Sequence, residues 1–148
     1  MDKIVFTNGC FDIVHRGHIE LLKYCREIGS YVIVGLNSDD SVKKLKGEQR
    51  PYFNQEDRKI LLENLSCVDE VHIFNEETPY NLISELKPDI IVKGGDYTPS
   101  SVVGSNLSEV RIFNFIEGYS TTKILDKMKW LMFLILMAHF VQILMVTI

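Results

Sequence analysis

The chain has 148 residues, of which 46% are apolar and 24% charged, and its net charge is −4. This length and composition predict one globular domain with a sizeable core and exclude wholesale disorder. The mild acidity argues against a nucleic-acid binder, which normally carries a basic face. Three widely spaced cysteines fit neither a disulfide framework nor a zinc site, and the first residues lack a signal-peptide pattern, so the expected localisation is cytoplasmic.

Strand-like and helix-like segments alternate through the first 129 residues. Short runs rich in β-branched and apolar residues predict five strands, over residues 3–7, 31–36, 70–74, 89–92 and 110–115. Amphipathic or capped segments predict helices over residues 17–28, 39–45, 55–65 and 79–86, and a last helix that begins at Ser120. This alternation predicts an α/β fold, in which a five-stranded parallel sheet is covered by helices on both faces.

Several helix boundaries and faces are predicted from local patterns. Gly29 stands where a left-handed C-terminal cap belongs, Ser38 is a suitable N-cap, and Thr78 precedes a proline at the first position of a helix. The helix over residues 55–65 is expected to turn three apolar side chains toward the core: Ile60, Leu61 and Leu65.

The loop after the first strand carries the strongest chemical signal. In parallel sheets the ligand lies beyond the carboxyl ends of the strands, and this loop leads from such an end to a helix that begins near Gly17. The N–H groups and partial positive charge of a helix N-terminus suit phosphate, and His15 and His18 can donate hydrogen bonds to phosphoryl oxygens there. Two solvent-facing histidines are the alternative, whereas a zinc pair lacks a further ligand nearby.

A second candidate anion site lies at the start of the last predicted helix. Three hydroxyl residues, Ser120, Thr121 and Thr122, follow the final strand and a glycine. Such residues are usually only helix caps. Two helix N-termini facing one crevice would nevertheless suit a triphosphate, so the two signals together predict a nucleotide site.

These motifs resemble those of the nucleotidyltransferase superfamily of cytidylyl- and adenylyltransferases. The closer resemblance is to the heptose-1-phosphate adenylyltransferase domain of the bifunctional heptose kinase/adenylyltransferase of lipopolysaccharide core synthesis. It covers roughly residues 3–127, in the stretches TNGCFDIVHRGHIELL at 7–22, NSDDSVKKLKGEQRP at 37–51, EDRKILLENLSCVDEV at 56–71, PDIIVKGGDY at 88–97 and NFIEGYSTTKI at 114–124. Phe115 stands where glycerol-3-phosphate cytidylyltransferases carry an arginine, which favours the heptose branch. No kinase half precedes Met1, which predicts a stand-alone transferase.

The resemblance implies a Rossmann-like nucleotidyltransferase fold and an enzyme that joins a sugar phosphate to a nucleoside triphosphate. The expected substrates are ATP and D-glycero-D-manno-heptose 1-phosphate, and the expected products are ADP-heptose and pyrophosphate. Mg²⁺ would bridge the triphosphate with few protein ligands, and no metal site of the protein itself is expected. Two alternatives stay open: a cytidylyltransferase acting on glycerol 3-phosphate or another polyol phosphate, and a non-enzymatic nucleotide sensor. Similar enzymes also pair as homodimers.

The resemblance also implies roles for individual residues. His15 and His18 would stabilise the α-phosphate, and Lys46, or Lys44 in a different register, would close over the phosphates. The β- and γ-phosphates would be held by Ser120, Thr121 and Thr122. The remaining expected nucleotide- or sugar-binding residues are Thr7, Asn8, Gly9, Phe11, Gly17, Lys93, Gly94 and Asp96.

Three further residues have structural alternatives to a catalytic role. Asp12 is either a buried carboxylate that ties the loop to its surroundings or a catalytic group. Arg58 is expected to form a salt bridge on a helix face, and Cys10 is expected to be a small apolar filler, because no base is placed to activate it.

The last nineteen residues differ from the rest of the chain. Residues 130–148 contain sixteen apolar side chains and no charge, and only His139, Gln142 and Thr147 interrupt them. As a helix they would be about 28 Å long, close to the ~30 Å hydrocarbon core of a bilayer. We therefore expect a transferase domain over 1–129 and an apolar helical segment over 130–148 that anchors the enzyme to the inner face of the membrane. The alternatives are packing on a partner subunit and a non-native extension.

Overall fold

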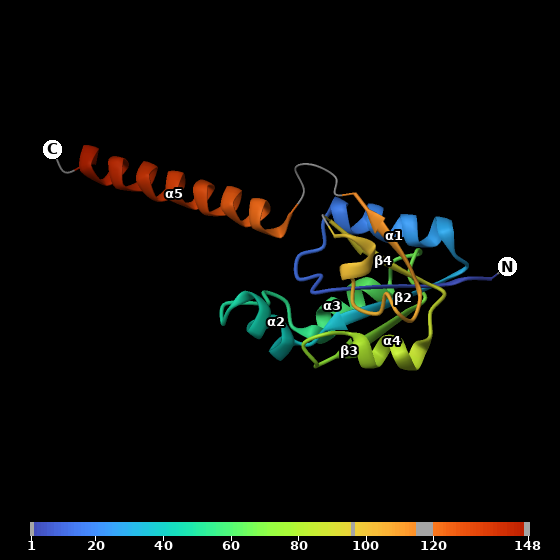
Figure 1. Ribbon diagram of the computed structural model, residues 1–148. Coiled ribbons are helices and arrows are strands. Elements are labelled where there is room, and N and C mark those ends of the chain that lie inside the picture. Colours follow the sequence, from blue (N-terminus) through green and yellow to red (C-terminus); the bar gives the residue numbers. More distant parts are fainter. Residues whose placement is uncertain (1, 96, 115–119, 147–148) are drawn as a thin grey trace.

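A computed structural model describes residues 2–95, 97–114 and 120–146, and side chains as far as Met137 (Figure 1). The elements run in the order β1 (Ile4–Gly9), α1 (Arg16–Ile28), β2 (Tyr31–Asn37), α2 (Asp39–Lys46), α3 (Gln55–Glu63), β3 (Glu70–Phe74), α4 (Tyr80–Leu86), β4 (Ile90–Gly94), a short 3-10 helix (Pro99–Ser101), β5 (Glu109–Phe113) and α5 (Thr121–Val146). The predicted alternation of strands and helices is confirmed, with bounds that shift by one or two residues at most strands.

All five strands are parallel and lie in the order β3-β2-β1-β4-β5. The central strand is β1, whose Val5 lies opposite Val32 on β2 and Ile90 on β4. The chain builds the sheet outward from β1 to β3, then returns to lay β4 on the other side of β1. The order therefore reverses between β1 and β4, which is the switch point where open parallel sheets bind their ligands.

Apolar side chains bury both faces of the sheet. On one face the strand residues pack against α1 and α3, through a set that includes Val5, Val32, Val34, Val92, Leu22, Cys25 and Leu62. On the other face the packing against α4 and the segment after the 3-10 helix uses Phe6, Ile33, Ile91, Ile83 and Val102. Neighbouring strand residues such as Val5 and Phe6 belong to opposite faces, as the period of two requires. The predicted coverage of both faces is confirmed.

The predicted role of Gly29 as a left-handed cap is wrong. Its backbone is extended, with φ −151° and ψ 161°. A Cβ atom at this position would lie 2.3 Å from Cγ2 of Val5 and 2.7 Å from the carbonyl oxygen of Lys3. Glycine is needed here because the chain leaving α1 passes directly against the start of β1.

The predicted N-caps are partly confirmed. Ser38 caps α2, because its hydroxyl accepts a hydrogen bond from the backbone N–H of Ser41 at 3.1 Å. Helix α4 starts at Tyr80, one residue later than predicted, so that Pro79 rather than Thr78 is the N-cap.

The predicted inward face of α3 is also wrong in part. Ile60 and Leu61 are 57% and 50% exposed, whereas Arg58 and Leu62 are fully buried. A spacing of four residues places Arg58 and Leu62 on one face of the helix. An arginine can occupy that buried position only if its donors are satisfied, and the site described below shows how they are.

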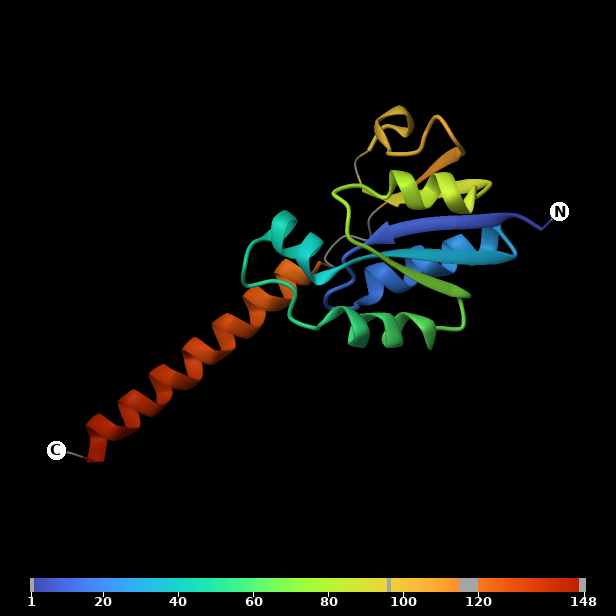
Figure 2. The same cartoon turned by 90° about the horizontal axis from the view of Figure 1, so that it is seen from below.

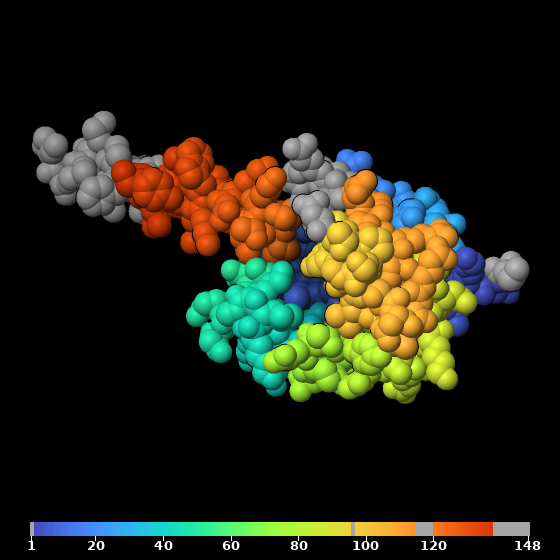
Figure 3. All heavy atoms as spheres, in the orientation of Figure 1, coloured from blue at the N-terminus to red at the C-terminus, as the bar shows by residue number. Residues whose placement is uncertain are grey.

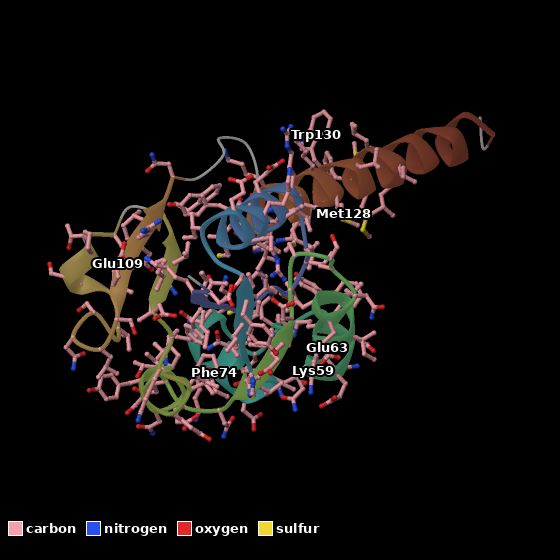
Figure 4. All side chains as sticks on the ribbon, turned by 90° about the vertical axis from the view of Figure 1, so that its right-hand side faces the viewer. Lys59, Glu63, Phe74, Glu109, Met128 and Trp130 are labelled. Carbon is pink, nitrogen blue, oxygen red and sulfur yellow. The ribbon has the colours of Figure 1, made fainter. Side chains whose placement is uncertain are left out.

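Helix α5 projects away from the sheet in both ribbon views (Figures 1 and 2). Ser120 precedes it and caps it, accepting a hydrogen bond from the N–H of Lys123 at 3.2 Å. The apolar side chains of Met128 and of residues 130–137 are all more than two-fifths exposed, and Met128 and Trp130 stand clear of the body in Figure 4. Within the described part of the chain, no helix has the length and apolarity that crossing a bilayer requires.

Candidate active site

A cleft of about 580 Å³ opens at the carboxyl edge of the sheet, at the switch point. Its walls come from the ends of β1 and β4, from α1, from the C-terminal end of α2, from the start of α4 and from residues 101–103. Figure 3 shows this hollow between α2 (teal) and the segment after β4 (yellow), with blue residues of β1 and its loop at the floor. Segments far apart in the sequence therefore meet in one ligand-sized space.

The two predicted histidines form a compact pair at the N-terminus of α1. His15 is the N-cap, and its Nδ1 accepts a hydrogen bond from the N–H of Gly17 at 3.1 Å. The Nδ1 of His18 accepts one from the N–H of His15 at 3.3 Å, which completes a capping box. The two imidazoles stack with their centroids 3.9 Å apart. Backbone hydrogen bonds therefore fix both rings beside the first turn of the helix.

This arrangement assigns the proton on each neutral ring. Because Nδ1 accepts a backbone hydrogen bond in both histidines, the proton belongs on Nε2, which is left to donate. Burial, together with the charges of His15 and Lys46, lowers the pKa of His18 to about 4. Burial also lowers the pKa of His15. Near neutral pH His18 is thus an uncharged donor at the wall of the cleft.

The lowered pKa of His18 predicts a pH dependence of stability. Between pH 6.5 and about 4 the unfolded chain binds a proton at this residue and the folded chain does not. Protonation therefore favours the unfolded chain, and the free energy of unfolding falls as the pH drops from 6.5 toward 4. We expect the free energy of unfolding, measured with urea, to fall over this range, and His18→Gln to reduce the slope. An unchanged slope in the variant would contradict the assignment.

Lys46 and Lys93 bring positive charge to the cleft from opposite sides of β1. Lys46 ends α2 and lines the cleft, whereas Lys44 does not line it. Lys93 is the last residue but one of β4, and its ammonium donates a hydrogen bond to Oδ1 of Asn8 at 3.2 Å. Burial lowers the pKa of Lys93. The cleft is therefore suited to an anionic ligand.

Asp12 joins the first loop to the segment that follows α2. Its carboxylate is 2% exposed and accepts hydrogen bonds from Nε of Arg50 and from the N–H groups of Tyr52 and Phe53, at 2.7 and 3.1 Å. These contacts support the structural interpretation of this residue. Because the segment they fix starts directly after Lys46, Asp12 limits where that lysine can lie.

The buried guanidinium of Arg58 holds the same region from α3. It donates to the carbonyl oxygens of Cys10, Asn37 and Phe53 and to Oδ1 of Asp39, at 2.6 to 2.9 Å. The salt bridge predicted for this residue is confirmed by the ion pair with Asp39, although the arginine side chain is completely buried. Every donor nitrogen has an acceptor, which is what allows the burial.

Most of the predicted binding residues meet in this cleft. Those that line it are Thr7, Asn8, Gly9, Phe11, His18, Lys46, Lys93 and Gly94. His15 and Gly17 lie at the adjoining helix start. Among the described residues, Ser120, Thr121 and Thr122 do not line the cleft, and Asp96 lies outside the described residues.

Sequence reasoning missed part of the wall. Glu77, Thr78 and Pro79 reach the cleft because α4 starts at the carboxyl edge, and Val102 and Val103 follow the 3-10 helix. The predicted helix start near residue 79 could have pointed to Glu77, Thr78 and Pro79, because a helix that follows a parallel strand begins near the carboxyl edge of the sheet. No motif marks Val102 and Val103.

The fold and the cleft together define a class of α/β proteins, those that bind a nucleotide phosphate at the switch point of a parallel sheet. The family model described as cytidylyltransferase-like matches residues 6–134. The chain therefore belongs to the cytidylyltransferase-like family.

The relatives and solved structures agree with this assignment. The chain is 55% and 56% identical, over 128 residues or 86% of its length, to proteins named bifunctional protein HldE from Helicobacter pylori and Campylobacter concisus. It spans 28% and 27% of those relatives. A lipopolysaccharide core biosynthesis protein from Thermoplasma volcanium matches with a TM-score of 0.64 and 28% identity, over 80% of this chain and 98% of that one. A bifunctional NMN adenylyltransferase/ADP-ribose pyrophosphatase from Francisella tularensis shares the fold, with a TM-score of 0.61, 16% identity and coverage of 86% of this chain and 42% of that one.

Proposed function

We propose that this chain joins ATP and D-glycero-D-manno-heptose 1-phosphate to give ADP-heptose and pyrophosphate, as a step in making lipopolysaccharide or surface-glycan precursors. The observation that carries the proposal is the cleft at the switch point, where His18, Lys46 and Lys93 converge beside the N-terminus of α1. The high identity to the HldE proteins and the likeness to a lipopolysaccharide core biosynthesis protein support the choice of acceptor.

The proposed reaction needs no covalent enzyme intermediate. An oxygen of the sugar phosphate attacks the α-phosphorus of ATP and forms a new P–O bond. The bond from that phosphorus to the bridging oxygen breaks, and pyrophosphate leaves with the electron pair. Since both reactants are already anionic, the protein's contribution is to position them and to stabilise the charge that develops.

The described side chains suit these tasks. His18 can donate its Nε2 proton to an α-phosphate oxygen while its Nδ1 stays bonded to the backbone. The partial positive charge at the N-terminus of α1, beside His18, also favours an anion. Lys46 supplies a positive charge from an exposed position at the cleft wall. We also propose that Ser120, Thr121 and Thr122 bind the β- and γ-phosphates.

Magnesium would enter as part of the nucleotide. Among the described residues there is no group of three or more histidine, cysteine or carboxylate side chains that could hold a metal ion. We expect a Mg²⁺ ion that is held chiefly by phosphate oxygens and water. The ion would neutralise charge on the leaving pyrophosphate. The cationic side chains of the protein would bind and orient the phosphates.

The test is pyrophosphate release by the purified chain with Mg²⁺. ATP with heptose 1-phosphate is compared with CTP and glycerol 3-phosphate, and the sugar product is identified by mass. We expect ADP-heptose from the first pair and little product from the second. Turnover only with CTP would assign a cytidylyltransferase. Tight ATP binding without turnover of any acceptor would assign a nucleotide sensor.

Helix α5 is the basis of a proposal about association. Its exposed apolar residues, Met128 and 130–137, form a surface of the kind that rarely stays in water. We propose that a second subunit or a lipid surface covers it. The whole chain should elute as a dimer or float with lipid vesicles, whereas a chain ending at Lys129 should do neither and should keep its kcat. Identical behaviour of the two chains would contradict the proposal.

A further inference from the structure

The environment of Lys93 is unusual for a lysine. Its ammonium is partly buried near the end of β4, and its contacts among the described residues are neutral: Oδ1 of Asn8 at 3.2 Å and the ring of Tyr97, whose centroid is 5.8 Å away. Within the described residues it forms no ion pair, although the carboxylate of Glu77 also lines the cleft. Burial lowers its pKa, since the charged form has lost water. Such a charge is stabilised when an anion enters the cleft.

The cations of the cleft fall into two groups. His15 and His18 stack at the start of α1, and Lys46 ends α2, which follows the strand on one side of β1. Lys93 lies on the other side of β1, next to the switch point. The cleft therefore carries a cation on each side of β1, and each of them can serve as an anion subsite.

The proposed reaction requires two such subsites. In an in-line displacement the attacking oxygen and the leaving oxygen lie on opposite sides of the phosphorus. The acceptor phosphate must therefore bind away from the pyrophosphate, and its negative charge needs a cation of its own. Resting on the proposed function, the geometry points to Lys93, held by Asn8, as the receptor for the phosphate of the acceptor sugar, and so as the residue that selects a phosphorylated acceptor.

The apolar wall fits this assignment. Three residues that come after β4 in the chain line the same cleft as Lys93: Tyr97, Val102 and Val103. An aromatic ring and aliphatic groups suit the carbon face of a sugar, while the lysine holds its phosphate. The nucleotide phosphates are left to the group around His18.

The test is the variant Lys93→Met, which keeps the length of the side chain and removes its charge. We expect KM for heptose 1-phosphate to rise about 10- to 100-fold, the loss of one hydrogen bond to a charged group, while KM for ATP changes little. Lys93→Arg should restore part of the loss. Lys59→Met is the matched control, because this lysine pairs with Glu63 on α3 (Figure 4).

A binding measurement separates this proposal from the proposed function. Calorimetry follows inorganic phosphate and heptose 1-phosphate binding to the wild-type chain and to Lys93→Met, and ATP binding to both, without turnover. Weaker phosphate binding with unchanged ATP binding supports the assignment, even if no acceptor turns over in the wild type. Equal phosphate binding by the two chains, or a matching loss of ATP affinity, overturns it. If Lys93→Met does not fold, Lys93→Gln takes its place, because it also removes the charge, and the same weaker phosphate binding is expected.

Discussion

Replacing His18 with alanine is expected to lower kcat about 10²–10³-fold, the usual effect of removing one donor that stabilises transition-state charge. ATP affinity should change much less, because the charge on the α-phosphate grows only as the attack proceeds. Pyrophosphate release at saturating substrates measures kcat, and equilibrium titration measures ATP affinity. Near wild-type kcat in this variant would show that the ring is structural.

Two conservative variants divide the roles of the His18 ring. The side-chain oxygen of asparagine can stand in for Nδ1, which accepts from the N–H of His15, but it offers no donor at the Nε2 position. The longer glutamine amide can supply a donor near that position. We therefore expect His18→Gln to keep more of kcat than His18→Asn. The reverse order would mean that the capping contact, rather than the donor, sustains catalysis.

His15 is a poorer probe of catalysis than its position in the motif suggests. Its ring accepts from Gly17 as the N-cap of α1 and also supports the ring of His18 by stacking. Its replacement by alanine removes a cap, which costs about 0.5–2 kcal/mol of stability. A loss of activity in that variant would mix helix fraying with lost chemistry, so the pair His18→Gln and His18→Asn is the cleaner experiment.

The sequence predicted the residues that local chemistry marks. His15 and His18 bracket a glycine at a helix start, and Lys93 lies near the end of a buried strand, so the rule of carboxyl strand ends was enough to bring them to one edge. The same rule does not give distances, and it did not choose between Lys44 and Lys46. That choice depends on where α2 ends and on the direction of its last turn, which the fold decides.

The failures have a common physical cause, which is that tertiary contacts override local pattern. Apolar periodicity placed Ile60 and Leu61 inside α3, yet the buried position belongs to Arg58, because three backbone carbonyls and Asp39 satisfy it. Gly29 was predicted to adopt a left-handed conformation after α1. Glycine is needed there instead because the start of β1 passes too close for a Cβ atom. Neither the carbonyls nor the passing strand leaves a signal in the local sequence.

The hydrogen bonds that Asp12 accepts from Arg50, Tyr52 and Phe53 form what we call the Asp12 clasp. We expect the largest loss of stability when this clasp is removed. Asp12→Ala would leave the half-buried guanidinium of Arg50 without its carboxylate and the N–H groups of Tyr52 and Phe53 without their acceptor. Breaking a buried ion pair by removing one partner costs about 3–5 kcal/mol. We expect a loss of that size in the free energy of unfolding, measured with urea at pH 7.

Two controls show whether the clasp itself is responsible for that loss. Asp40→Ala removes a carboxylate from an exposed pair with Lys43, and it should change stability by less than about 1 kcal/mol. Arg50→Met added to Asp12→Ala should recover part of the loss, because the unpaired charge goes with it. Since the segment held by Asp12 begins directly after Lys46, the surviving folded fraction of Asp12→Ala should also bind ATP more weakly. Full stability in Asp12→Ala would mean that Arg50 finds solvent or another acceptor, and that the position of Lys46 is set by α2 alone.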